Sequence, residues 1–148
     1  MMTSKILFDT NVLVYNQVKE SSFHFQAALY HQKLMEGKIQ AVVAAQNLLE
    51  FAVVMVNPKK IVKPLSESRV AKEMKKYQQG QFEMIYPNAE TLFLLGNLIR
   101  KTKLANPKRF FDLFLAATML ANKVETILTA NVGDFQIEGI RTIELKAS

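Results

Sequence analysis

Two carboxylates are isolated in long apolar stretches of the chain. Glu50 is the only charged residue between positions 39 and 56, and Asp112 is the only ionisable one between positions 110 and 122. Both lie in the first part of a segment with the composition of a buried helix. An ionised carboxylate in such surroundings is costly unless it is paired or binds a metal. For Glu50, the alternative is a partly exposed side chain that the helix dipole stabilises.

Two further carboxylates follow predicted strands. Asp9 comes directly after residues 6–8, and Asp134 follows residues 125–129. Such apolar runs are typical of parallel strands buried on both faces, and ligands of open α/β sheets bind at the carboxyl ends of the strands. The chain has 13 acidic residues, but Asp9, Asp112 and Asp134 are its only aspartates. We therefore expect all three to serve one site.

Asp9 has an alternative role, as the N-cap of a helix predicted from residue 12. Thr10 and Asn11 are also good capping residues. Because the other aspartates and Glu50 are expected at the same edge of the sheet, we assign capping to Thr10 or Asn11. Asp9 is then free to bind a metal.

The elements that position these residues alternate along the chain. This alternation of strands and helices predicts an α/β fold with a mainly parallel sheet. In such a sheet, the carboxyl ends of the strands and the first turns of the following helices share one edge, so residues distant in sequence converge there. Strands are predicted at residues 6–8, 39–45, 82–86, 125–129 and 140–145, and helices at residues 12–18, 23–36, 46–56, 67–79, 89–102 and 110–122.

The composition limits the class of protein. The length of 148 residues suits one domain with its own core, and no linker or repeat divides it, so we expect residues 1–148 to form a single domain. No signal peptide and no membrane span are predicted. The absence of cysteine excludes disulfides and thiolate metal sites and is compatible with a cytoplasmic location. A net charge of +6 makes nucleic acid a candidate partner.

The four carboxylates predict a particular chemistry. Clustered carboxylates repel one another unless cations neutralise them. Hard oxygen ligands favour Mg²⁺ or Mn²⁺ over zinc, and His24 and His31 lack the spacing of a metal-binding pair. In a basic protein, such a metal site indicates phosphodiester hydrolysis, in which the ion activates a water and stabilises charge on the phosphate.

Two groups of basic residues are candidate contacts for RNA or for a protein partner. One shares a face of the helix predicted at residues 67–79, and the other precedes the helix that carries Asp112. A charged helix face is usually only solvated, which is the alternative for the first group. The residues are Arg69, Lys72 and Lys76 in the first group and Lys108 and Arg109 in the second.

Four segments of the chain resemble the signature blocks of PIN domains. The resemblance is closest to the VapC-type toxins of bacterial and archaeal toxin–antitoxin pairs. The blocks occur in the family's order and cover essentially the whole chain. They are residues 8–13, 46–51, 112–117 and 129–135.

The resemblance implies a three-layer α/β/α sandwich around a mainly parallel sheet of about five strands. It implies a Mg²⁺- or Mn²⁺-dependent endoribonuclease that a small antitoxin protein holds inactive, and many relatives are homodimers. Asp9 and Asp112 would bind the metal most directly, and Glu50 and Asp134 directly or through water. The whole site would consist of Asp9, Glu50, Asp112 and Asp134, supported through hydrogen bonds by Thr10, Asn11, Thr129 and Asn131.

Three other classes of protein share part of this pattern. A PIN-like module could bind RNA or a partner with weak or no nuclease activity, but the intact set of acids argues against it. A phosphatase of the haloacid dehalogenase type normally carries a second acid two residues after the first, where this chain has Asn11. A response-regulator receiver needs an acid cluster before its first helix and a downstream lysine, and the segments do not match.

Overall fold

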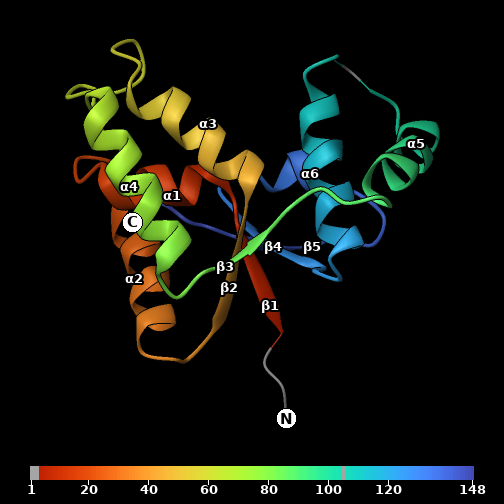
Figure 1. Ribbon diagram of the computed structural model, residues 1–148, viewed down its shortest axis with the longest axis horizontal. Helices are drawn as coiled ribbons and strands as arrows, with labels where there is room; N and C mark the ends of the chain where they lie inside the picture. The colour runs from red at the N-terminus through yellow and green to blue at the C-terminus, as the bar shows by residue number, and fades with distance from the viewer. Residues whose placement is uncertain (1–3, 105) are drawn as a thin grey trace.

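The computed structural model describes residues 4–104 and 106–148 as a five-stranded sheet between two layers of helices (Figure 1). All neighbouring strands are parallel, which confirms the predicted α/β fold with its parallel sheet. The strand order is β3-β2-β1-β4-β5. The strands are β1 (Lys5–Phe8), β2 (Gln40–Ala44), β3 (Glu83–Ile85), β4 (Thr126–Thr129) and β5 (Arg141–Glu144).

The helices form two groups on opposite faces of the sheet (Figure 1). The first four helices cover one face, and α5 and α6 cover the other. Within the described residues, no helix is both long enough and apolar enough to cross a bilayer. The helices are α1 (Thr10–Gln17), α2 (His24–Met35), α3 (Ala45–Met55), α4 (Glu67–Gln79), α5 (Thr91–Lys101) and α6 (Arg109–Ala121), and a short 3₁₀ helix η1 (Val132–Phe135) follows β4.

Successive strand residues enter two separate cores, because side chains alternate across a strand. Phe8, Ala41 and Val43 pack with the α1–α4 layer, whereas Leu7 and Val42 pack with the α5–α6 layer. All five are almost fully buried. Each large apolar side chain buried in this way contributes about 1.5–3 kcal/mol to folding. This double burial explains why the sequences of β1 and β2 are apolar runs instead of alternating patterns.

The first strand lies at the centre of the sheet, and this placement determines where a crevice forms. From β1 the chain builds β2 and β3 outward on one side, and it later adds β4 and β5 on the other. The connections that leave β1 and β4 therefore run in opposite directions. In open α/β sheets, such a reversal of strand order leaves a crevice at the carboxyl ends of the strands.

Two predicted helix starts differ from the structure by two residues, and the others agree within one. α1 begins at Thr10, two residues before the predicted start, because Asp9 is its N-cap and the side-chain Oδ1 of Asp9 accepts a hydrogen bond from the Thr10 N–H. α5 begins at Thr91 instead of residue 89. There the Asn88 side chain accepts a hydrogen bond from the Glu90 N–H, which holds these residues in a turn before the helix.

Candidate active site

Asp9 lies at the carboxyl end of the central strand and is only 8% exposed. Its Oδ1 accepts from the Thr10 N–H at 2.8 Å, and its Oδ2 accepts from the Thr129 hydroxyl at 2.7 Å and from the Asn11 side chain at 3.2 Å. Our assignment of the capping role to Thr10 or Asn11 was wrong, because Asp9 itself caps α1. One carboxylate oxygen caps the helix while the other is held by side chains.

Glu50 approaches the same edge from the second turn of α3. Its Oε1 accepts from the Thr10 hydroxyl at 2.9 Å, and its Oε2 accepts from the Gln46 side chain at 3.4 Å. The fully buried Asn47 donates to the Thr10 hydroxyl at 3.2 Å and accepts from the Ala44 N–H at 3.0 Å. These hydrogen bonds connect the start of α3 to the start of α1.

The end of β4 supplies a second set of polar contacts. The Thr129 hydroxyl accepts from the Asn131 N–H at 3.0 Å and from the Asn11 side chain at 3.3 Å. The Asn11 side chain in turn accepts from the Ala130 N–H at 3.2 Å. Of the four predicted supporting residues, Thr10, Asn11 and Thr129 thus use their side chains. Asn131 contributes its backbone N–H, and its side chain lines the cavity at this edge.

Asp112 and Asp134 lie beside a cation from their own chain. The Arg109 Nε atom is 3.3 Å from Asp112 Oδ2, and the Nη1 atom is 3.9 Å from Asp134 Oδ1. Nη2 also donates to the Asp134 backbone oxygen at 2.8 Å. Arg109 was predicted as a contact for RNA or a partner, but here it faces the acidic edge. Lys108, predicted with it, is exposed.

Burial is the main reason why Asp9 is hard to ionise. It raises the pKa of Asp9 to about 6. The hydrogen bonds from Thr129 and Thr10 act in the opposite direction, and the nearby charges of Glu50 and Asp134 add to the increase. At neutral pH, the protein therefore holds a buried negative charge that its own donors only partly stabilise.

Burial also raises the pKa of Asp112 to about 6. The negative charge of Asp134 adds to the increase, the Arg109 guanidinium opposes it, and Asp9 and Glu50 raise it further. All four predicted acids are thus close enough to affect one another electrostatically. A single arginine does not offset their combined repulsion at Asp112.

A divalent cation is the ligand whose chemistry this donor set fits. The site offers hard carboxylate oxygens, and its buried aspartate is reached by neutral donors alone among the described residues. Over residues 4–104 and 106–148, however, no three carboxylate or histidine side chains are close enough together to hold an ion as they stand. Arg109 instead accompanies two of the carboxylates.

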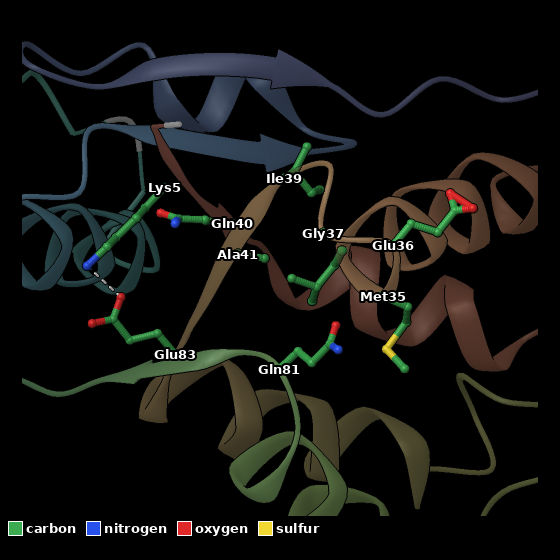
Figure 2. Close-up of a pocket in the computed structure, with 10 residues that line it drawn as sticks. Lys5, Met35, Glu36, Gly37, Ile39, Gln40, Ala41, Gln81 and Glu83 are labelled. Carbon is green, nitrogen blue, oxygen red and sulfur yellow. Dashed lines mark ion pairs between the residues drawn. The ribbon is translucent and has the colours of Figure 1, made fainter. Parts of the chain in front are cut away.

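A cavity of about 440 Å³ lies at the acidic edge of the sheet. Three of the acids, Asp9, Asp112 and Asp134, line this cavity. Glu50 does not line it and accepts a hydrogen bond from Thr10, which does. A larger cavity of about 570 Å³ lies at the opposite edge, where β1, β2 and β3 begin (Figure 2). Its lysine and one of its glutamates, Lys5 and Glu83, pair at 2.8 Å. Active sites of parallel sheets form at the carboxyl edge, so the first cavity is the candidate site.

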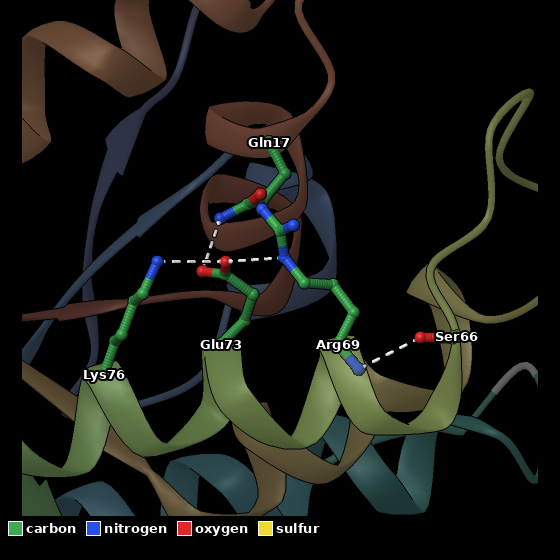
Figure 3. A network of polar contacts seen from close by, with 5 residues as sticks. All are labelled: Gln17, Ser66, Arg69, Glu73 and Lys76. Atoms are coloured by element: carbon green, nitrogen blue, oxygen red, sulfur yellow. Dashed lines mark hydrogen bonds and ion pairs between the residues drawn. The ribbon is translucent and has the colours of Figure 1, made fainter.

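The predicted basic face of α4 is partly neutralised by an acid that sequence analysis overlooked. Glu73 is only 5% exposed, and its Oε1 accepts from Lys76 Nζ at 3.1 Å and lies 3.4 Å from Arg69 Nε (Figure 3). Gln17 of α1 donates to the other oxygen at 3.3 Å. Lys72 is exposed on the same helix. Two of these three basic residues therefore pair with an acid of their own helix, and this acid joins α4 to α1 through Gln17.

Two further polar residues of the site were not singled out from the sequence. Asn47 and Gln46 lie in the first turn of an otherwise apolar helix, which is the pattern that drew attention to Glu50. Gln46 also donates to the Phe111 backbone oxygen at 3.0 Å, which joins the start of α3 to the start of α6. A search for polar residues isolated in apolar segments, the pattern that identified Glu50, would have found both Asn47 and Gln46.

A family model with the description PIN domain matches residues 6–136, and the chain belongs to this family. The match spans β1 to η1 and includes the whole acidic edge. A comparison with curated proteins finds no match.

Solved structures with the same fold include several toxin–antitoxin proteins. VapBC2 from Rickettsia felis, bound to a DNA fragment from its promoter, has a TM-score of 0.67 at 16% identity, covering 96% of this chain and 99% of that one. VapC20 of Mycobacterium tuberculosis, a toxin that cleaves the sarcin–ricin loop, has a TM-score of 0.61 at 12% identity, with 92% and 98% covered. A toxin–antitoxin complex from Klebsiella pneumoniae has a TM-score of 0.59 at 23% identity, with 97% and 99% covered. At these identities, the likeness establishes the fold.

Proposed function

We propose that the protein is a Mg²⁺- or Mn²⁺-dependent endoribonuclease and the toxin of a type II toxin–antitoxin pair, with residues 1–148 as one nuclease domain in the cytoplasm. The observation that carries this proposal is the incompletely balanced negative charge at the carboxyl edge of the sheet. No cation contacts the buried Asp9 over residues 4–104 and 106–148, and burial and neighbouring carboxylates raise the pKa of both Asp9 and Asp112. Such a site gains most from a divalent ion.

In this proposal, Asp9 and Asp112 hold the ion most directly, with Glu50 and Asp134 binding it directly or through water. When bound, the ion would activate a water and stabilise negative charge on the phosphate. The chain itself orients the ligands. Thr129 fixes the Oδ2 atom of Asp9, and the other supporting hydrogen bonds hold Glu50 against α1.

A small antitoxin is the proposed protein partner, and a homodimer is the proposed assembly. Support for a partner comes from relatives of the same fold that were solved as toxin–antitoxin complexes. Large apolar side chains also lie exposed on this chain, among them Leu49 and Val53 on α3 and Phe93 on α5. Leu49 and Val53 lie one turn apart on α3, and neighbouring exposed apolar side chains are typical of surfaces that contact another protein.

The alternative is a PIN-like module that binds RNA or a partner with weak or no nuclease activity. The observation in its favour is that the described carboxylates do not enclose an ion as they stand and that Arg109 accompanies two of them. Under this alternative, RNA binding would persist without divalent ions, and no cleavage would follow their addition.

The deciding experiment compares RNA cleavage by wild type and Asp112→Asn in Mg²⁺, in Mn²⁺ and in EDTA. We expect Asp112→Asn to lower the rate at least about a hundredfold, because the ion supplies several kcal/mol of charge stabilisation. Glu73→Gln is the matched control, since it neutralises a buried carboxylate outside the site and should retain most activity. Equal cleavage by wild type and Asp112→Asn, or cleavage that continues in EDTA, would contradict the proposal.

A further inference from the structure

The cavity at the acidic edge extends well beyond the carboxylates. Part of its lining comes from α1, α3 and the segments that follow these two helices, and we call this part the side pocket. None of the proposed catalytic steps uses it. About 440 Å³ in total is within the range of small-ligand sites and exceeds what an ion with its waters needs. The side pocket consists of Val14, Tyr15, Val18, Val54, Lys60 and Ile61.

The walls of the side pocket are apolar and well anchored. Val14 and Ile61 are 7% and 8% exposed, so they belong to the core as much as to the cavity. The Tyr15 ring stacks on Phe23 with centroids 4.8 Å apart and planes within 15°. One face of Tyr15 is therefore covered, and it is the remaining part of the ring that lines the cavity. An aromatic wall held in this way loses little conformational entropy when a ligand binds.

Charge is distributed unevenly along the cavity. One end carries Asp9, Asp112 and Asp134, and Lys60 provides the positive charge among the described residues that line the cavity. A ligand that fits this cavity has a flat apolar part for the side pocket and an anionic group for Lys60. It also reaches the carboxylates that are proposed to bind the metal. A nucleotide of a polyanionic chain has these properties, because its base is flat and its phosphates are anionic.

We propose that the side pocket binds the base of an unpaired nucleotide next to the scissile phosphate of RNA, while Lys60 contacts the adjoining phosphate. This inference rests on the proposed function and adds a substrate class to it. A base can enter the pocket only after it leaves its stack and its pairing partner. The substrate is therefore single-stranded or looped RNA, and the pocket contributes to the choice of nucleotide at one position.

The chain offers neighbouring residues that separate the side pocket from its surroundings. Val54 lines the cavity, whereas Val53 is 59% exposed and does not line it. Lys60 lines the cavity, whereas the adjacent Lys59 does not. Val54→Trp should fill the side pocket, with Val53→Trp as its control. Lys60→Gln should remove the phosphate contact, with Lys59→Gln as its control.

The test measures binding of six-nucleotide single-stranded RNAs, each with one 2-aminopurine, to the Asp112→Asn protein in Mg²⁺. Val54→Trp should weaken binding about ten- to a hundredfold, the usual effect of losing one base–aromatic contact, and should abolish the change in 2-aminopurine fluorescence. Val53→Trp should remain within about twofold. Lys60→Gln should reduce the slope of log affinity against log salt by about 0.7, whereas Lys59→Gln should leave it unchanged.

Equal binding by Val54→Trp and Val53→Trp would overturn the inference, as would undiminished binding of an RNA whose nucleotides are abasic. If wild type cleaves RNA while these variants bind alike, only the side pocket is assigned wrongly. If wild type cleaves nothing but binds RNA in the base-dependent manner described, the pocket assignment stands and the nuclease function fails. Absence of any RNA binding contradicts both.

Discussion

Asp9 and Glu73 are two buried carboxylates that the same chain treats in opposite ways. They are 8% and 5% exposed. Glu73 has a lysine and an arginine beside it, and although burial raises its pKa, the hydrogen bonds and charges of Lys76 and Arg69 outweigh burial and lower the pKa overall. Asp9 is reached only by neutral donors among the described residues, and burial raises its pKa to about 6.

The difference separates a carboxylate whose charge is paired within the chain from one whose charge is not. The charge of Glu73 is balanced within the chain, so that it fastens α4 to α1 (Figure 3). The charge of Asp9 is not balanced by a cation among the described residues, and in the proposed function a bound metal ion balances it. Burial alone does not distinguish the two residues, whereas the identity of their partners does. A buried acid without a cation is the better indicator of a binding site.

The largest expected difference between the two residues is their response to metal. Mg²⁺ or Mn²⁺ at about a hundred times its dissociation constant should stabilise wild type by about 3 kcal/mol at pH 7, because the ion binds the folded state alone. Thermal unfolding with and without the ion measures this. Glu73→Gln should show the same stabilisation, and Asp9→Asn should show almost none. A full metal response in Asp9→Asn would remove Asp9 from the site.

The next largest effect is the pH dependence of the free energy of unfolding in the absence of metal. Since the folded protein raises the pKa of Asp9 to about 6, the protonated form is favoured, and the associated stability is complete below about pH 4 and is lost as pH rises through 6. Asp9→Asn mimics the neutral form. It should raise the free energy of unfolding by about 1–3 kcal/mol at pH 7 and change it little at pH 4. Urea titrations in EDTA at both pH values provide the measurement, and destabilisation at pH 7 would contradict the argument.

Glu73→Gln should change the free energy of unfolding in the opposite direction, lowering it by about 1–2 kcal/mol at pH 7. The cost is moderate because the two cations it leaves behind are more than half exposed. The pKa of Glu73 is lowered, so its contribution is present above the unfolded-state pKa and is lost as pH falls through the folded one. The same urea titrations measure it. If Glu73→Gln were more stable than wild type, the contrast between a paired Glu73 and an unpaired Asp9 would be wrong.

The smallest effect is expected at Arg109. Its positive charge partly offsets the negative charges of Asp112 and Asp134, whereas Asp9 has no such partner among the described residues. If Asp112 and Asp134 bind a metal as proposed, the ion pairs of Arg109 would compete with that metal for them. Arg109→Gln should therefore bind Mn²⁺ about two- to fivefold more tightly, the effect of one partly exposed ion pair. Calorimetric titration of Mn²⁺ into both proteins decides the point, and weaker binding by Arg109→Gln would assign Arg109 a supporting role.

Much of the fold was predictable because its elements are determined by local sequence. Apolar runs predicted the central strands, and an alternating pattern predicted the last strand, β5. Acids isolated in apolar helices pointed to the carboxyl edge of the sheet as the candidate site. The start of α1 was predicted two residues late, since a sequence does not show that one oxygen of Asp9 caps the helix while the other accepts from Thr129.

Burial and pairing of charged residues were harder to predict. Glu73 lies among lysines on an amphipathic helix, and only the approach of α1 buries it. Arg109 was predicted as a contact for RNA or a partner because it is basic and precedes Asp112. Its position against Asp134 depends on where η1 folds back, which no local pattern determines. The side pocket likewise arises from α1 and α3 packing side by side.

The hydrogen bond between Asp9 and Thr129 has a consequence for the synthesis of the protein. The two residues are 120 positions apart in the chain. A growing polypeptide emerges from the ribosome with its first aspartate long before the fourth strand exists to hold it. The contact between Thr129 and Asp9 can form only when nearly the whole chain is available, so an unfinished or truncated product lacks the complete set of four carboxylates. If the protein is the proposed nuclease, its fragments would therefore lack the complete site.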